Sequence, residues 1–540
     1  MDPTVVIACI DEEISRHRLL VSNLRSKRNS FVIISRLPDE ILASIFTHGA
    51  RDYHEGNDHA SFCVPDWVSV SYVCRRWRDV ALNCPTLWTY HFTVSLRWTE
   101  ELLARSKQAS LRIYIKYASL GPGPWWSDLV EKVLNHAERI QELRLHIPAT
   151  LFPTRLSLYA PRLQILDIFA HARAPFEWTA AINYWDIPSL RTLKLTNCPL
   201  PWHSLNLSRV TTLVLTCVPT SFRQNPVEFL ATLSRTQALT VLHLEYALSS
   251  ALFNGALGVY PRVALPYLAR LLVLAPISTV VALLSCINIP LETQVRLEIP
   301  DDGTAVNDYA QLPPLFAQRF SQSEDLSSFC ATIRSLVVNV SPNGLTLVVC
   351  ASGPSDCDPR LSMAYPPREC SAYLTILIMM NPSIFTDINS RDCLIGDICC
   401  SIPSTHVQTL HVIDPPLPSD FWRKTLGHLR GLRYMKLSDG CVPDLVSLLA
   451  ILETPNLHVA SNHDLAQDRE FVPALEELEL YRIRFRFMDE DSLSQKSLPD
   501  TLSTRKARIS LIDCTTGEDE SDSVDDDSDV DSLAEIADDV

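Results

Sequence analysis

The sequence contains little glycine and none of the short patterns that mark common catalytic sites. Only 14 of the 540 residues are glycine, and no G-x-x-x-x-G-K-[ST] or G-x-G-x-x-G loop is present to hold a phosphate group. The H-E-x-x-H pattern of zinc hydrolases and the G-x-S-x-G turn of serine hydrolases are also absent. We therefore predict a protein that is not an enzyme and has no catalytic or cofactor-binding residues.

Long apolar runs are missing as well. No stretch of about 20 apolar residues could cross a bilayer, and the N-terminus lacks the basic-then-apolar pattern of a secretory leader. The 16 cysteines include no C-x-x-C pair and no Cys/His ladder, so we expect reduced, buried thiols and no metal site. These features predict a soluble intracellular protein, in the cytoplasm, the nucleus or both, without a membrane partner.

The balance of charge excludes another class of partner. The net charge is −16, so the protein as a whole repels the phosphate backbone of nucleic acid. Proline is plentiful, at 36 residues, and is spread through the chain. Proline interrupts helices and strands, so this distribution favours many short elements joined by turns.

The segment from residue 36 to 92 carries the clearest local signals. Pro38 suits the first position of a helix, and Asp39 and Glu40 lie in the first turn, where the helix dipole favours negative charge. A second helix is predicted over 70–81, and Pro85 marks its end. The apolar positions of the two helices recur at helical spacing: Leu37, Ile41, Leu42, Ile45 and Phe46, then Val70, Val73, Cys74, Trp77, Val80 and Ala81.

This segment, within 33–95, resembles an F-box domain of the kind found in the expanded F-box families of mushroom-forming fungi. Leu-Pro-x-Glu-Ile-Leu and Val-Cys-Arg-x-Trp carry the resemblance, while the loop from Gly49 to Asp66 is longer than in the shortest F-boxes. The resemblance implies docking onto a Skp-type adaptor and, through it, a cullin. The residues that match the adaptor-facing or motif-defining positions are Leu37, Pro38, Ile41, Leu42, Ile45, Phe46, Val70, Cys74 and Trp77. The plainer alternative is an amphipathic helical hairpin packed on the next domain.

An N-terminal amphipathic helix is predicted within residues 1–30. Apolar residues spaced by three and four form a short heptad-like stripe, with His17 among them: Ile7, Ile10, Ile14, Val21 and Leu24. The stripe could pair with another helix. Alternatively, it packs against the chain's own F-box.

A different repeated sequence pattern extends over residues 105–490. Segments of the form apolar-x-x-Leu-x-Leu recur, and several follow Pro-x. They begin at Ile140, Leu163, Leu190, Val210, Leu239, Leu268, Ile333, Val407, Leu432 and Leu475. Between the first six, the spacing is about 20–29 residues, the period of leucine-rich repeats. In Leu-x-Leu both leucines leave a strand on the same side, and the first apolar residue should fill the turn that enters the strand.

We therefore predict an α/β repeat fold: a helical F-box followed by an irregular leucine-rich-repeat solenoid of short parallel strands and helices. The asparagine that usually links such repeats is mostly missing, with Asn197 one of few candidates. The rhythm weakens between about 300 and 405. An ordinary α/β domain with leucine-rich strands is the alternative. Residues 500–540 are rich in acids and serines and are predicted to form a disordered tail.

Taken together, these features predict the substrate-receptor subunit of a Skp–cullin–F-box ubiquitin ligase, in which the repeats bind an unknown target protein. Positions between the core leucines, such as Arg144, Lys194 and His243, would face that target. The alternative is a scaffold that binds the adaptor or other partners without taking part in ubiquitin transfer.

Overall fold

The structure is a computed structural model of the chain. It describes residues 3–56, 66–92, 96–117, 125–148, 158–171, 185–198, 206–220, 223, 226–249, 262–300, 309–321, 333–341, 344–350, 372–379, 388–404, 406–413, 419–441, 475–485, 508–512 and 515–516. The chain divides into two compact units, Met1–Ser323 with Tyr373–Ile384, and Glu324–Ala372 with Phe385–Val540. Among the described residues, no helix has both the length and the apolar character that a bilayer crossing requires.

The first unit begins with a helical region. Its elements are α1 (Pro3–Asn29), η1 (Ile33–Arg36), α2 (Asp39–Gly56), η2 (Asp66–Ser69), α3 (Val70–Val73), α4 (Arg75–Leu82), η3 (Pro85–Trp88) and α5 (Leu96–Arg105). The helix predicted over 70–81 is in fact two, α3 and α4, because Cys74 between them has an extended backbone with φ −156°. The loop expected from Gly49 is shorter than predicted, since α2 continues to Gly56.

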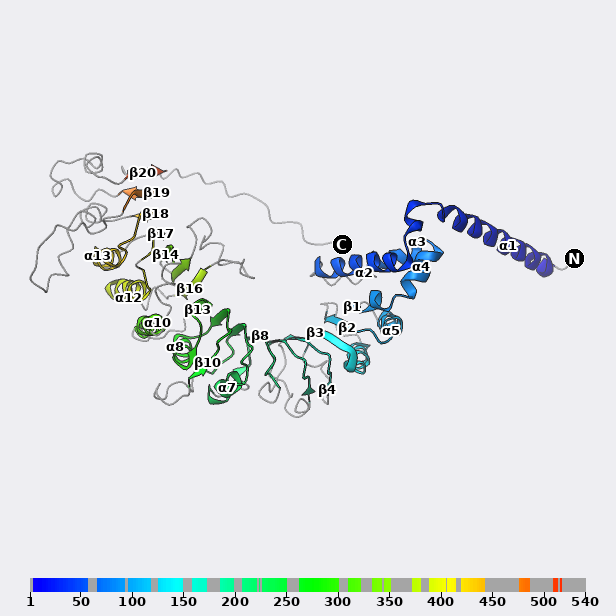
Figure 1. Ribbon diagram of the computed structural model, residues 1–540, viewed down its shortest axis with the longest axis horizontal. Coiled ribbons are helices and arrows are strands. Elements are labelled where there is room, and N and C mark those ends of the chain that lie inside the picture. The colour runs from blue at the N-terminus through cyan, green and yellow to red at the C-terminus, as the bar shows by residue number, and fades with distance from the viewer. Residues whose placement is uncertain are drawn as a thin grey trace, which may run out of the picture. The chain divides into compact units, whose positions relative to one another are not determined.

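A parallel sheet follows in the same unit (Figure 1). Its strands pair in the order β1-β2-β3-β5-β7-β8-β9-β11-β13-β16. They span Tyr90–Phe92, Leu111–Lys116, Ile140–Pro148, Ile165–His171, Thr192–Thr196, Thr212–Thr216, Val241–Glu245, Arg270–Leu274, Gln294–Ile299 and Ala372–Met379. The connections carry α6 (Trp125–Leu134), η4 (Ala137–Arg139), α7 (Pro226–Leu233), α8 (Ile277–Cys286) and α10 (Leu312–Ser321), and two short pairs, β4–β6 (Leu158–Tyr159, Trp185–Asp186) and β10–β12 (Val263–Ala264, Ile287–Asn288).

The same turn leads into five of the predicted Leu-x-Leu segments, those that begin at Leu163, Leu190, Val210, Leu239 and Leu268. The N–H of Leu163 donates to the carbonyl of Ala160 at 3.1 Å, and Leu190 donates to Ile187 at 3.3 Å. Equivalent turns close at Val210, Leu239 and Leu268. Where the sequence has Pro-x-Leu, the proline takes the second position of the turn, for which its fixed φ is suited. The closing residue is buried in each case, as the sequence predicts.

A backbone link joins the far ends of neighbouring strands. Asn197, Cys217 and Tyr246 follow β7, β8 and β9, and all three have a positive φ, between 45° and 52°. The N–H of Asn197 donates to the carbonyl at the end of β8 at 2.9 Å, and Cys217 and Tyr246 make the same bond to β9 and β11 at 2.7 and 2.9 Å. The left-handed backbone is costly for a side chain other than glycine or asparagine. The bond to the next strand offsets part of that cost, and only one of the three positions is the expected asparagine.

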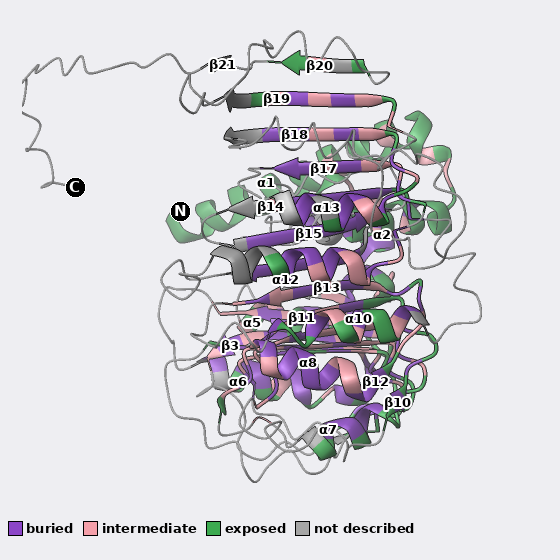
Figure 2. Ribbon diagram, turned by 90° about the vertical axis from the view of Figure 1, so that its left-hand side faces the viewer, coloured by how far each residue is buried: buried purple, intermediate pink, exposed green. Residues whose placement is uncertain are grey.

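The second unit contributes strands of mixed direction. Its strands pair in the order β15-β14-β17-β18-β19-β20, with β15 antiparallel and the others parallel. They span Gly344–Cys350, Ser335–Ser341, Thr409–Ile413, Tyr434–Cys441, Glu477–Phe485 and Arg508–Ile512; β21 (Thr515–Thr516) also pairs with β19. The helices are α12 (Ile388–Ser401) and α13 (Ser419–His428). Figure 2 shows β17, β18 and β19 stacked in parallel, with buried and half-buried residues alternating along each strand.

Four strands depart from the sequence interpretation. β20 and β21 lie in the segment 500–540 that was expected to be a disordered tail, because Ile509 and Leu511 alternate as a strand requires; residues 517–540 lie outside the described residues. β2 and β13 were missed. In β13 the spacing from Leu291 to Val295 is four residues rather than three, and β2 has plain alternation without the leading apolar residue.

We predict that truncating a leucine of the repeat destabilises the sheet far more than truncating its neighbour on the same strand. Leu213 of β8 is buried, whereas Val214 is half-exposed. Leu213→Ala should lower the free energy of unfolding by about 2–5 kcal/mol because it leaves a cavity. Val214→Ala, the matched control, should cost less than about 1 kcal/mol. Urea denaturation followed by circular dichroism measures both, and equal losses would contradict the proposed core.

Candidate functional site

The helical region after α1 has a core of its own. Leu42, Phe46 and Ala50 of α2 pack with Val80 and Ala81 of α4, and with Trp67, Val68, Leu87, Trp88 and Leu102 from the surrounding elements. We call the part from η1 to η3 the helical module. These core residues are therefore buried by contacts within the module and with α5.

Tryptophan residues connect the helical module to the start of the sheet. Trp88 of η3 is buried between Trp67, with ring centroids 5.5 Å apart, and Trp98 of α5, at 6.4 Å. Its indole N–H donates to the carbonyl of Ala81 at 2.7 Å. Immediately after it, the carbonyl of Thr89 accepts a bond from the N–H of Arg112 in β2 at 2.9 Å. The core of the module thus extends to α5, and a backbone hydrogen bond joins the end of the module to β2.

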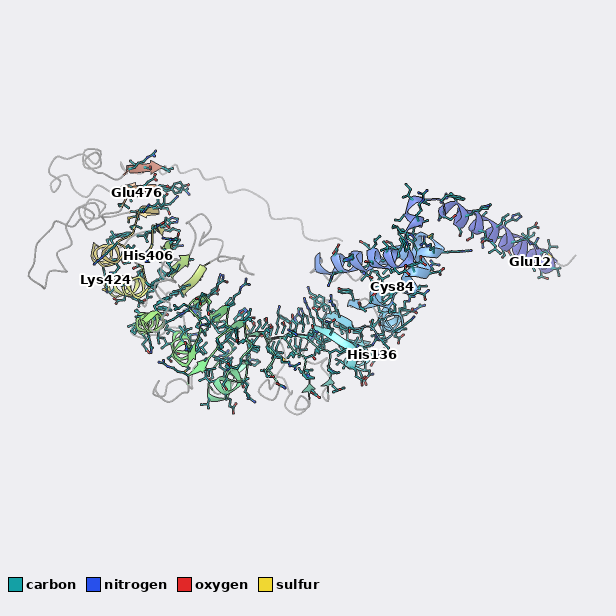
Figure 3. The ribbon with its side chains drawn as sticks, in the orientation of Figure 1. Glu12, Cys84, His136, His406, Lys424 and Glu476 are labelled. Carbon is teal, nitrogen blue, oxygen red and sulfur yellow. The ribbon has the colours of Figure 1, made fainter. Side chains whose placement is uncertain are left out.

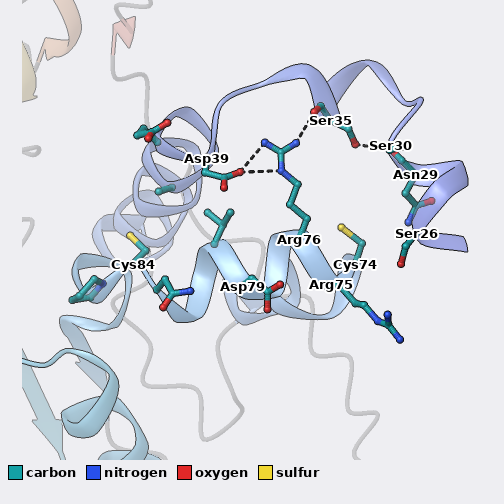
Figure 4. A pocket seen from close by; sticks show the side chains of 15 residues that line it. Ser26, Asn29, Ser30, Ser35, Asp39, Cys74, Arg75, Arg76, Asp79 and Cys84 are labelled. Atoms are coloured by element: carbon teal, nitrogen blue, oxygen red, sulfur yellow. Dashed lines mark hydrogen bonds and ion pairs between the residues drawn. The ribbon is translucent and has the colours of Figure 1, made fainter. Parts of the chain in front are cut away.

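A single arginine links the two main helices of the module. In Figure 4, Arg76 of α4 reaches Asp39 at the start of α2 and the chain just before it. Its Nε donates to Asp39 Oδ1 at 2.9 Å, and its terminal nitrogens donate to the carbonyls of Ser35 and Leu37, each at 2.5 Å. A guanidinium is a planar fork of donors, so it can satisfy all three acceptors together. The surrounding pocket, of about 780 Å³, is lined by α1, η1, α2 and α4.

Several large apolar side chains of the module remain exposed to solvent. Ile41 and Ile45 lie one turn apart on α2, and each is 48% exposed. Others lie on the segment before α2 and on α3: Phe31, Val32, Ile33, Ile34, Tyr72 and Val73. Exposed apolar side chains in this number are typical of a protein–protein interface.

The structure places the nine predicted site residues at three levels of burial. Pro38, Ile41 and Ile45 are exposed, where a partner could contact them. Leu42 and Phe46 are buried in the core, at 0% and 3% exposure. Leu37, Val70 and Trp77 are half-buried against that core, and the rings of Trp77 and Phe46 lie 5.0 Å apart. Cys74 caps α4, its sulfur accepting the N–H of Trp77 at 3.5 Å.

Two features of the module were not found from the sequence. Arg76 was not predicted for the site, because its three acceptors come from a segment about 40 residues earlier. The exposed run Phe31–Ile34 precedes the Leu-Pro signal, and four consecutive apolar residues have no period from which to assign a face. Its position directly before that signal was the available clue.

The first sheet also presents a regular row of side chains between its core leucines. The strand register places Arg144, Asp167, Lys194, Val214, His243, Leu272 and Arg296 side by side, one from each strand from β3 to β13. We call the surface that they form the open face. Arg144, Lys194 and His243, predicted to face a target, all belong to this row. Figure 3 shows the side chains that cover these strands.

Aromatic and histidine rings gather at one end of the open face. Tyr114 of β2 contacts His146 of β3, with ring centroids 5.2 Å apart, and His146 contacts Phe169 of β5 at 5.5 Å. His171 lies 4.9 Å from Phe169 and 6.4 Å from Tyr117. Burial lowers the pKa of His171, and the nearby His146 and Lys116 act in the same direction. Aromatic clusters of this kind often anchor protein interfaces.

Further along the row, His243 lies among charges of both signs. Burial lowers the pKa of His243; Lys194 and Arg296 act in the same direction, while Glu298 opposes them. Its Nε2 lies 3.9 Å from a carboxylate oxygen of Glu245, and Arg296 donates to Glu298 at 2.6 Å. Within the described ranges, no group of His, Cys, Asp and Glu side chains is arranged to hold a metal ion.

Comparison with known proteins identifies the helical module. Residues 34–93 match the model of the F-box-like family. The match covers the helical module and the first strand, and it does not extend into the rest of the sheet. No curated protein matches the chain. An F-box-like domain thus occupies residues 34–93.

We predict that Arg76→Ala loosens the F-box-like domain. The substitution leaves the carbonyls of Ser35 and Leu37 without this donor and removes the partner of Asp39, so the free energy of local opening should fall by about 1–3 kcal/mol. Hydrogen exchange of the α2 and α4 amides measures this quantity. Arg75→Ala is the control, because Arg75 is exposed and, among the described residues, donates to Asn23 alone, at 3.2 Å. Similar exchange in both variants would remove the role assigned to Arg76.

We also predict that acid weakens the first sheet partly through His243. The pKa of His243 is lower in the folded protein than in the unfolded chain. Below the ordinary histidine pKa the unfolded chain therefore binds more protons, so the free energy of unfolding decreases as the pH is lowered. Between about pH 7.5 and about pH 5.5, the melting temperature of His243→Gln should fall less than that of the wild type. His48→Gln, at an exposed position on α2, should behave like the wild type. Identical pH dependence of all three proteins would exclude this contribution.

Proposed function

We propose that this chain is the substrate-receptor subunit of a Skp–cullin–F-box ubiquitin ligase. The observation that carries the proposal is the F-box-like domain at residues 34–93 together with the exposed Ile41 and Ile45 on its helix α2. F-box domains bind Skp-type adaptors, which in turn attach to a cullin. Apolar side chains at the surface of a folded module supply the buried contacts that such docking needs.

The repeating strands are the proposed receptor for the target. We interpret them as irregular leucine-rich repeats, of the kind found behind F-boxes in fungal families, because the same turn and the same buried leucines recur from strand to strand. The open face would contact the target protein, with the rings of Tyr114, His146 and Phe169 as its apolar anchor. The charged row beside them would set specificity by complementarity.

The mechanism is tethering. The chain itself performs no bond-making step; it holds a target near the ubiquitin carrier recruited by the cullin and so raises the effective concentration of acceptor lysines. Trp88 supports this role because it packs against Trp98 of α5, and the next residue, Thr89, is hydrogen-bonded to β2. A stiff connection restricts the volume that the bound target can explore, which increases this effective concentration.

A scaffold without ligase activity is the second candidate. It would use the F-box-like domain for the adaptor and the open face for a partner, as the receptor would. The two are distinguished by reconstitution with the adaptor, the cullin and a bound partner protein. Cullin-dependent ubiquitylation of that partner supports the receptor. A partner that stays unmodified while bound supports the scaffold.

We predict that Ile41→Asp/Ile45→Asp abolishes adaptor binding. Two charged groups would have to be buried in the interface, so the affinity should fall about 100-fold or more, equivalent to about 3 kcal/mol. Calorimetric titration of the purified full chain with the Skp-type adaptor measures the affinity. The exposed positions are preferable to Trp77, whose contact with Phe46 would confound docking with folding.

Val227→Asp is the matched control, an equally exposed apolar residue on α7 outside the F-box-like domain. It should bind the adaptor as the wild type does. Failure of the wild-type chain to bind any Skp-type adaptor would overturn the proposed function, and unchanged binding by the double variant would overturn the assigned surface.

A further inference from the structure

The N-terminal helix α1 does not bury its apolar side chains. It has 27 residues, and none of them is buried. Nine large apolar residues on it are between 38% and 59% exposed. The hydrogen bonds that join it to the F-box-like domain involve polar groups: the side chain of Arg75 donates to that of Asn23, and the hydroxyl of Ser35 donates to the carbonyl of Asn29. The sequence allowed two arrangements for this stripe, pairing with another helix or packing against the F-box-like domain. The structure does not have the second one, because no residue of α1 is buried.

The exposed residues form a seam of a specific kind. Taking Ile7 as position a of a heptad, the a positions are Ile7, Ile14 and Val21, and the d positions are Ile10, His17 and Leu24. Three β-branched residues at a favour two parallel strands in a coiled coil. The seam covers most of α1, so the apolar face is long enough for roughly three heptads of pairing.

The charges beside the seam complement those of a second, parallel copy. Glu13 occupies position g and Arg18 the following e position, five residues later. In a parallel pair, g of one helix meets this e position of the other, so Glu13 faces Arg18 of the second copy, twice by symmetry. The two His17 side chains meet at one d layer, where a polar pair costs stability but fixes the register.

We infer that α1 pairs with α1 of a second copy of this chain as a parallel two-stranded coiled coil. Each dimer would then hold two F-box-like domains and two repeat arrays. This inference does not depend on the proposed ligase function, because the seam and its charges belong to α1 alone.

Sedimentation equilibrium of the full chain, over a range of concentrations, tests the pairing. The wild type should have the mass of two 60.7 kDa chains. Ile10→Glu/Val21→Glu, which places charges in the d and a layers, should have the mass of one. The control, Val5→Glu/Leu19→Glu, alters two equally exposed residues at the f positions opposite the seam and should remain a dimer. Circular dichroism and adaptor titration establish that every variant is folded.

A crosslink then tests the parallel direction. In a Cys9→Ser background, Ile7→Cys places a thiol at an a position at one end of the seam, where the two copies meet only in a parallel pair. Mild oxidation should join two chains by a disulfide at position 7, identified by peptide mass spectrometry. Ser15→Cys, outside the seam, should not crosslink. A monomeric wild type, or a dimer that survives the seam substitutions, would overturn the inference. A dimer that Ile7→Cys fails to crosslink would overturn the parallel arrangement.

Discussion

The need of each parallel strand for a neighbour governs the first unit. A strand in such a sheet satisfies its backbone only through the strands beside it, and an uncovered edge is a site for uncontrolled pairing. β1 has β2 on one side, and the element that precedes it, η3, carries Trp88 into the core of the F-box-like domain. The domain thus serves as the terminal cap that a stack of repeating units requires. Docking module and structural cap are the same group of residues.

On the open face, positively and negatively charged side chains form close pairs. Arg296 donates to Glu298 on the same strand, and Arg144 pairs with Glu142 in the same way at 2.5 Å. Such pairs contribute little to stability when they are near the surface. The register also places Asp167 between Arg144 and Lys194, so neighbouring strands present charges of opposite sign. A partner can therefore approach a face of patterned rather than uniform charge, a condition that favours specificity over strength.

Features of the fold that depend on a few neighbouring residues could be predicted from the sequence, whereas contacts between distant segments could not. Pro188-Ser-Leu190 predicts both the turn and the strand that follows, because proline and the buried leucine act within four residues. Ile41 and Ile45 were also predicted for the site, since their helical spacing is local. The three acceptors of Arg76 lie about 40 residues away, and no period in the sequence links them. The strand β20 was missed for a similar reason. Its short apolar alternation is followed by an acidic segment that favours disorder, and the strand depends on its pairing with β19, about 30 residues earlier.

The left-handed residues after β7, β8 and β9 bear on how such a chain can change over time. Each adopts a conformation that it would avoid alone and is held by a carbonyl of the following strand. Removing one strand with its turn would bring the following strand alongside, and that strand ends in an equivalent carbonyl that could accept the same N–H. Losing the last strand of the series would instead leave the preceding residue strained and its N–H without this acceptor. The link therefore tolerates a change in the number of interchangeable units but requires that each left-handed residue be followed by another strand.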